Sequence, residues 1–364
     1  MTRLELSGYR LAICLGPGGV GKTTISAALA IGAAASGRAV DVMTVDPAPR
    51  LLDALGLEGV AAEPHEVNLD SVLRASDATR HGRLRALRLD PKATFDAIVR
   101  RHAASAAAAD AILAGRIYRN LASALAGVAD YMAMEKLLEL AADPATGLVV
   151  LDTPPAAEAL DFLDAPRRLV ELLGSRAVSL LGARRGPRRV SMVDIAARAI
   201  LGAFDRVTGL KLLADVQAFV GGFDGMYEGF AERATRASAM LRDGATGVIV
   251  VTTAEAGRIA QAREFIAALE RAALHVRAVI VNRAMPELPD PAEIERARIS
   301  AALKRKLRRN LEDHAALKAR ESISFDTLRS AMPAGAALML APELEHEPRT
   351  LPDLAQIAAS IHSA

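Results

Sequence analysis

A glycine-rich run near the N-terminus carries the residue types and the spacing best suited to chemistry. Residues 16–24 are GPGGVGKTT and match the pattern GxxxxGK(S/T). Glycines let backbone N–H groups turn inward to hold phosphate oxygens, and a helix that begins at Lys22 or Thr23 adds partial positive charge. We expect the Lys22 ammonium to reach the β- and γ-phosphates and the Thr23 hydroxyl to bind Mg²⁺. The run therefore predicts a nucleotide-binding loop whose other contacts are Gly16, Gly18, Gly19, Val20, Gly21 and Thr24.

Two carboxylates and an amide follow apolar runs further along the chain. Asp46 could position the water that attacks a γ-phosphate, or it could start a turn with Pro47, and position alone does not decide between the two. Asp152 closes its run in the manner of a Walker B motif and would hold Mg²⁺ or its water, unless it only caps the next turn. Asn282 could pair with an adenine edge, although an asparagine at a strand end by itself favours a turn.

These residues follow short runs rich in valine, isoleucine and leucine. Runs that are apolar throughout indicate strands buried on both faces of a parallel sheet. Helical stretches separate the runs, and this alternation is typical of a doubly wound α/β fold, in which the strand ends beside the P-loop face the ligand. The predicted strands are Leu11–Leu15, Ala39–Val45, Gly147–Leu151, Gly247–Thr252, Val276–Val281 and Ala337–Leu340.

Two long stretches, residues 92–142 and 164–243, carry almost no strand pattern and predict one helix after another. They lie on either side of the strand predicted at 147–151. We therefore expect a single domain over residues 1–364, with a mostly parallel sheet, a P-loop NTPase core and an inserted helical subdomain built from these two stretches. A further helix is predicted from about Pro291 to Ser330, because Asp290 and Pro291 suit its N-cap and N1 positions.

The composition excludes several classes of protein. The chain has 45 basic and 43 acidic residues among 364, 24% charged residues and 51% apolar residues, so it is neither disordered nor collagenous. Its net charge of +2 gives no reason to expect a nucleic-acid partner. The single cysteine, Cys14, excludes a disulfide framework and a cysteine-rich zinc site. No signal-peptide pattern and no apolar run near 18 residues is present, which predicts a cytoplasmic protein that is not an integral membrane protein.

Four short segments occur together in an order that resembles the ArsA family, which comprises ATPases that drive arsenite pumps and ATPases that target tail-anchored membrane proteins. The resemblance covers nearly the whole chain and includes Asp161-Phe162-Leu163. It implies an ATP-dependent dimer whose two nucleotide sites face each other. The four segments are Gly16–Thr24, Asp46-Pro47-Ala48, Asp152-Thr153-Pro154 and Val281-Asn282-Arg283.

The resemblance also implies roles for individual residues. Asp46 becomes the switch I residue that activates water beside Lys22, and Asp152 becomes the switch II residue near Mg²⁺. Asn282 becomes an adenine contact, and the loop that follows Pro342 closes over the base. The implied reaction is the hydrolysis of ATP to ADP and phosphate, with Mg²⁺ as the cofactor.

Three features depart from the family pattern. The second residue of the family's P-loop is a lysine that reaches the partner's phosphates, whereas this chain has Pro17, which supplies neither charge nor a backbone N–H. The missing charge would come from Arg50, from the basic cluster at 184–189 or from a paralogue in a heterodimer, or else hydrolysis is slow. Cys14 alone does not provide the thiolates of an arsenite site or the CxxC zinc clasp. One P-loop, not two in tandem, makes any two-site assembly intermolecular.

The predicted helical subdomain is where a client would bind. An apolar stripe at helical spacing could line a groove for an apolar helix, although such stripes are more often core. Its members are Phe219, Phe223, Met226, Tyr227 and Phe230. The basic stretch at 304–309 could meet acidic lipid or nucleic acid, but flanking acidic residues favour a solvated helix face.

The sequence thus predicts an ArsA-type ATPase that works as a nucleotide-gated dimer, with itself or with a paralogue. Hydrolysis would be coupled to a client helix or a membrane-pump component. A ParA/MinD-like positioning ATPase shares the same core, but the segment Leu351–Ala364 lacks the lysine and arginine of a basic membrane-targeting helix. The same core would also serve a non-hydrolysing nucleotide-binding subunit, which Pro17 suggests, or a small-molecule kinase.

Overall fold

The computed structural model describes residues 4, 6–57, 63–73, 82–115, 126–154, 156–174 and 226–363. The chain divides into two compact units. The sheet unit comprises Met1–Arg88, Asp143–Leu160 and Arg242–Ala364, and the helical unit comprises Leu89–Ala142 and Asp161–Leu241. Because residues 175–225 lie outside the described residues, the predicted extent of the helical subdomain stays a prediction.

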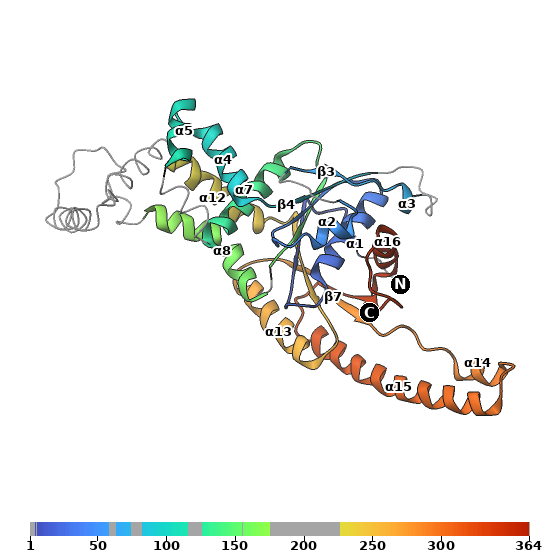
Figure 1. Ribbon diagram of the computed structural model, residues 1–364. Helices are drawn as coiled ribbons and strands as arrows, with labels where there is room; N and C mark the ends of the chain where they lie inside the picture. The colour runs from blue at the N-terminus through green and yellow to red at the C-terminus, as the bar shows by residue number, and fades with distance from the viewer. Residues whose placement is uncertain are drawn as a thin grey trace, which may run out of the picture. The chain divides into compact units, whose positions relative to one another are not determined.

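In the part of the chain that the structure describes, one nine-stranded sheet forms the centre of the sheet unit, in the order β3-β4-β2-β5-β1-β6-β7-β8-β9 (Figure 1). The strands from β4 to β8 in this order are parallel, and the short strands β3 and β9 pair antiparallel at the two edges. This arrangement confirms the predicted α/β fold with a mostly parallel sheet. The strands are β1 (Leu11–Leu15), β2 (Ala39–Thr44), β3 (His65–Glu66), β4 (Arg83–Arg88), β5 (Leu148–Asp152), β6 (Thr246–Thr252), β7 (Val276–Ala284), β8 (Ala337–Pro342) and β9 (His362–Ser363).

The central strands follow the apolar pattern closely, and β1, β5 and β6 are buried along their whole length. That pattern does not predict β4, whose sequence RLRALR contains three arginines. Its arginines alternate with buried residues such as Leu84 and Ala86 near the edge of the sheet. β4 is therefore a half-buried strand, and a search for runs that are apolar throughout does not find it.

Two neighbouring helices of the sheet unit begin in different ways. α1 (Lys22–Ala35) starts directly after Gly21, and α16 (Leu351–Ser360) begins with a capping box formed by Thr350 and Asp353. α1 and α16 pack side by side, and both contribute to the apolar cluster that covers one set of strand side chains (Figure 1). The other helices that cover or flank the sheet are α2 (Arg50–Ala54), α3 (Asp70–Leu73) and α13 (Ala256–Arg271).

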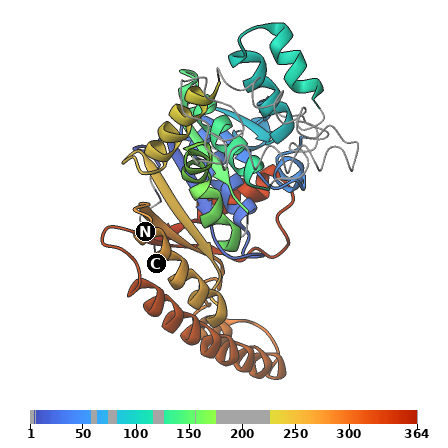
Figure 2. The ribbon, with the colours of Figure 1, turned by 90° about the vertical axis from the view of Figure 1, so that its left-hand side faces the viewer.

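The helix predicted from Pro291 to Ser330 is in fact two helices, α14 (Pro291–Arg296) and α15 (Ala301–Arg329). Ala297 has an extended backbone, and the Ser300 hydroxyl accepts a hydrogen bond from the Leu303 N–H, so a new N-cap interrupts the helical run. α15 extends away from the sheet, and Glu321 and Leu328 are its buried residues (Figures 1 and 2). The basic stretch at 304–309 lies on this exposed helix.

Described residues of the helical unit form α4 (Pro91–His102), α5 (Ala106–Ala114), α7 (Ala126–Ala142), α12 (Tyr227–Leu241) and most of α8 (Ala156–Gly174). Two members of the predicted client stripe, Met226 and Phe230, are only 2% and 6% exposed and belong to the core with Phe95 and Tyr131. They therefore do not line a groove. Phe219 and Phe223 lie outside the described residues, as does the side chain of Tyr227. No helix in the described ranges combines the length and the apolar character that crossing a bilayer requires.

Candidate nucleotide-binding site

The predicted site residues come from five parallel strands of the sheet unit. The P-loop follows β1, Asp46 follows β2, Asp152 ends β5, Asn282 lies near the end of β7 and Pro342 ends β8. Since the carboxyl ends of parallel strands share one edge of a sheet, all of these residues lie at the same edge, where open α/β folds bind ligands.

Two glycines of the P-loop have no room for a side chain. A Cβ on Gly16 would collide with the backbone carbonyl oxygen of Val251 in the neighbouring strand β6. Gly21 has a φ of +86°, and a Cβ there would collide with the side-chain amide of Asn282. The loop is thus packed tightly between Val251 and Asn282, and Gly18 lies in a turn between the two contacts.

Lys22 folds back onto this loop. Its side chain is nearly buried, and Nζ donates hydrogen bonds to the carbonyl oxygens of Gly16 and Pro17, each at 3.1 Å. Burial lowers the pKa of Lys22, while the charges of Asp152 and Asp46 act in the opposite direction. Phosphate oxygens would replace these two carbonyl partners with charged ones, which bind an ammonium group more strongly.

Asp152 is the centre of a buried cluster of hydroxyl groups. Thr23 Oγ1 donates to Asp152 Oδ2 at 2.8 Å, Thr44 Oγ1 donates to the same oxygen at 3.0 Å, and Ser26 Oγ lies 3.4 Å from Oδ1. Burial raises the pKa of Asp152 to about 6, although the hydrogen bonds from Thr23 and Thr44 lower it. Thr23 and Asp152, the two predicted metal ligands, are therefore in direct contact. A hydroxyl and one carboxylate, completed by phosphate oxygens and water, form the oxygen-rich set that Mg²⁺ prefers.

Thr44 joins the two predicted switch residues, and the motifs in the sequence did not indicate it. Its hydroxyl donates to Asp152 and accepts a hydrogen bond from the Asp46 backbone N–H at 3.2 Å. Asp46 is half-buried, and its Oδ1 accepts a hydrogen bond from the Ala48 N–H at 2.9 Å, which closes the turn expected from an Asp-Pro pair. One carboxylate oxygen of Asp46 therefore stabilises the turn. Thr44 is the last residue of β2 and is fully buried, and a polar residue at the ligand end of an apolar run was the available signal for it.

Asn282 and Pro342 lie together at a cavity of about 370 Å³ that also involves Thr24. The Asn282 amide is buried, and its Nδ2 donates to the carbonyl oxygen of Val20 at 2.8 Å, so this residue braces the P-loop. The second N–H and the carbonyl oxygen of the amide are the groups that would pair with a base. Residues 343–348, which follow Pro342, line the same cavity.

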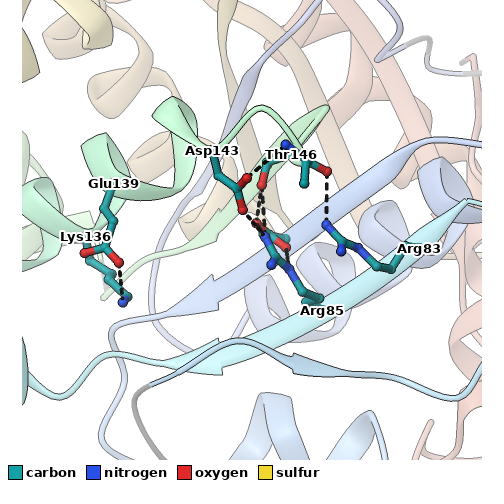
Figure 3. Close-up of polar contacts among 8 residues, drawn as sticks. Arg83, Arg85, Lys136, Glu139, Asp143 and Thr146 are labelled. Atoms are coloured by element: carbon teal, nitrogen blue, oxygen red, sulfur yellow. Dashed lines mark hydrogen bonds and ion pairs between the residues drawn. The ribbon is translucent and has the colours of Figure 1, made fainter.

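A different polar cluster lies towards the amino ends of β2, β4 and β5, at the edge of the sheet opposite to the P-loop (Figure 3). Arg85 makes a two-pronged ion pair with the buried Asp41, at 2.6 and 2.7 Å, and a further bond to Asp143 at 2.9 Å. The Thr146 hydroxyl donates to Asp41 at 2.6 Å. These polar groups from three chain segments supply one another's hydrogen-bond partners. The cluster therefore stabilises the sheet and takes no part in the predicted ligand site.

Comparison with known proteins agrees with this geometry. Residues 9–319 match the family described as anion-transporting ATPase. The chain is 28% identical over 211 residues to ATPase GET3 of Malassezia globosa, which covers 57% of this chain and 58% of that protein. It is 30% identical over 184 residues to ATPase GET3 of Chaetomium globosum, 50% of each chain. An uncharacterized protein of Streptomyces coelicolor, SCO2128, is 28% identical over 284 residues, 76% of this chain and 63% of that protein.

The matched region thus spans between 50% and 63% of the length of these relatives. The family match, by contrast, covers most of the present chain and includes the P-loop and the residues after β2, β5 and β7. The chain belongs to the ArsA family of anion-transporting ATPases.

Proposed function

We propose that this protein binds and hydrolyses ATP as a nucleotide-gated dimer and couples hydrolysis to the handling of a client. The observation that carries the proposal is the contact between the Thr23 hydroxyl and Asp152 directly beside the P-loop and Lys22. A buried carboxylate that contacts three hydroxyl groups, next to a loop suited to phosphate, is typical of a metal–nucleotide site. The client is proposed to be an apolar helix or a membrane-pump component, and the site of action the cytoplasm.

In this proposal the chain's own residues position ATP for attack by water. Lys22 moves from the carbonyl oxygens of Gly16 and Pro17 to the β- and γ-phosphates, and the P-loop amides hold the same oxygens. Thr23 and Asp152 would hold Mg²⁺, which neutralises charge on the phosphates. Asp46 Oδ1 is engaged by the turn, so Oδ2 is the oxygen that orients the attacking water.

The hydrogen bonds of Thr44 support the gating part of the proposal. This hydroxyl contacts both Asp152 and the Asp46 backbone, which begin the two segments proposed as switches. Metal bound by Thr23 and Asp152 would replace their mutual hydrogen bond and alter the hydrogen bond between Thr44 and Asp152. Because Thr44 also contacts the Asp46 backbone, the state of the nucleotide would change the conformation of both segments.

A second candidate function is a nucleotide-binding subunit that needs a lysine-bearing paralogue for hydrolysis. It rests on Pro17, which gives the P-loop no second charge.

The test is Mg²⁺-ATP turnover over a range of protein concentrations, with Asp46→Asn as the control. Turnover per chain that rises with concentration and disappears in the variant supports the dimeric ATPase. ATP binding without turnover at any concentration supports the second candidate, and absence of ATP binding refutes both.

A further inference from the structure

Arg258 lies beside the P-loop although neither the sequence pattern nor the family resemblance indicated it. It belongs to the first turn of α13, the helix that follows β6. β6 pairs in parallel with β1, and the carbonyl oxygen of Val251 in β6 lies against Gly16 at the start of the P-loop. The connection from β6 to α13 therefore places Arg258 at the ligand edge of the sheet.

The guanidinium group of Arg258 lies over the middle of the loop. Its Nη2 atom is 4.0 Å from the position that a Cβ would take on Gly19, and its side chain is half-buried. The Lys22 ammonium contacts the start of the same loop, where it donates to the carbonyl oxygens of Gly16 and Pro17. Two cations thus converge on one short run of backbone whose glycines leave its amides accessible.

No acidic side chain neutralises Arg258 within the part of the chain that the structure describes. Its Nη1 donates to the neutral Gln261 amide at 3.1 Å, one turn further along α13. The acidic residue at the start of the helix, Glu255, accepts a hydrogen bond from the Thr253 hydroxyl instead. A guanidinium held by a neutral partner, next to a lysine and a phosphate-type loop, has the charge and the paired donors that a phosphate group requires.

We propose that Arg258 is a phosphate-binding residue, which contacts the phosphate chain of the nucleotide held in the P-loop of the same chain. This proposal rests on the proposed function, since it needs a nucleotide in that loop. It gives the site a second cation where Pro17 supplies none. The candidates suggested by the sequence are less well placed: Arg50 is the exposed first residue of α2, and residues 184–189 lie outside the described residues.

The test is the equilibrium affinity of the full chain for Mg²⁺-ADP and for a non-hydrolysable ATP analogue, measured by calorimetry. Arg258→Ala is expected to weaken binding about tenfold or more, the loss typical of one charge-assisted hydrogen bond. Arg258→Lys keeps the charge and should restore part of the affinity. Two controls separate other causes: Gln261→Ala removes the neutral partner, and Arg263→Ala removes an exposed cation of the same helix.

Affinity in Arg258→Ala within about twofold of the parent would overturn the proposal. So would an equal loss in Gln261→Ala, because Arg258 would then act through the fold of α13. Should Arg258→Ala fail to fold, Arg258→Gln, which retains a polar side chain of similar length, replaces it with the same expected loss. A parent protein that binds neither nucleotide refutes the proposed function as well, whereas a parent that binds normally confines the failure to Arg258.

Discussion

Replacing Asp152 by asparagine should stabilise the nucleotide-free protein at neutral pH while removing its metal site. Asn keeps the shape of the side chain, and its carbonyl oxygen can still accept the hydrogen bonds of Thr23 and Thr44. Its Nδ2 can donate to the oxygen of Ser26, whose hydroxyl hydrogen is already directed to the Lys22 carbonyl at 2.9 Å. The substitution therefore removes a buried charge without leaving a buried polar atom unpaired.

The magnitude follows from the raised pKa. Burial shifts the pKa of Asp152 from 3.8 to about 6, and about 1.4 kcal/mol corresponds to each pKa unit, which gives about 3 kcal/mol. Well below pH 4 the carboxyl is protonated in both the folded and the unfolded chain, so it does not alter stability. Between pH 4 and pH 6 the unfolded chain loses this proton first, and above pH 6 the folded protein carries the full cost of the buried charge.

Urea unfolding of the parent and of Asp152→Asn between pH 4 and pH 8, without nucleotide or Mg²⁺, measures this difference. The variant should gain about 2 kcal/mol over the parent as the pH rises from 4 to 7, because a small part of the cost is already present at pH 4. Asp53→Asn, at an exposed carboxylate of α2, controls for the loss of one negative charge. Mg²⁺-ATP should then stabilise the parent but not Asp152→Asn. A stability difference that stays constant with pH would refute the account of Asp152 as a buried, costly charge.

Three further predictions concern other parts of the sheet unit. Asp41→Ala leaves Arg85 without its two-pronged partner and should cost about 3 kcal/mol of unfolding free energy in urea, the lower end of the range because Arg85 is partly exposed. Gly16→Ala forces a Cβ against the Val251 carbonyl, so calorimetry should show nucleotide affinity reduced about tenfold or more, and unchanged affinity would contradict the loop geometry. Burial raises the pKa of Cys14 to about 12, so a thiol reagent at pH 8 should label it only after unfolding.

Local sequence was sufficient for the central strands and for the position of the predicted ligands. An all-apolar run of five or six residues cannot pack as a half-exposed strand, so β1 and β5 had to be buried on both faces. Once these strands are parallel, Asp152 must lie at the edge of the sheet where the P-loop emerges. The motifs thus predicted Thr23 and Asp152 as two ligands of one metal at this edge, whereas their direct contact depends on β5 lying next to β1.

The residues that the sequence did not reveal are those whose role depends on contacts far along the chain. The break between α14 and α15 is an exception, because it follows from the local competition between the Ser300 cap and continued helix. β4 was missed because the partners of its arginines lie far along the chain: Arg85 pairs with Asp41 on the neighbouring strand, and Arg83 and Arg88 donate to the carbonyl oxygens of Ala145 and Pro47. Arg258 was missed because its proximity to Gly19 requires β6 to lie beside β1.

Asn282 shows how one such contact changes the interpretation of a residue. Its place at the end of a strand favoured a turn, and the family resemblance implied an adenine contact, but the structure adds a hydrogen bond to Val20 and close packing on Gly21. An amide that braces the P-loop and lines the adjacent cavity links the conformation of the loop to whatever fills that cavity. A base that pairs with Asn282 would therefore also fix the loop that holds its phosphates, so base recognition and phosphate binding at this site should be energetically coupled.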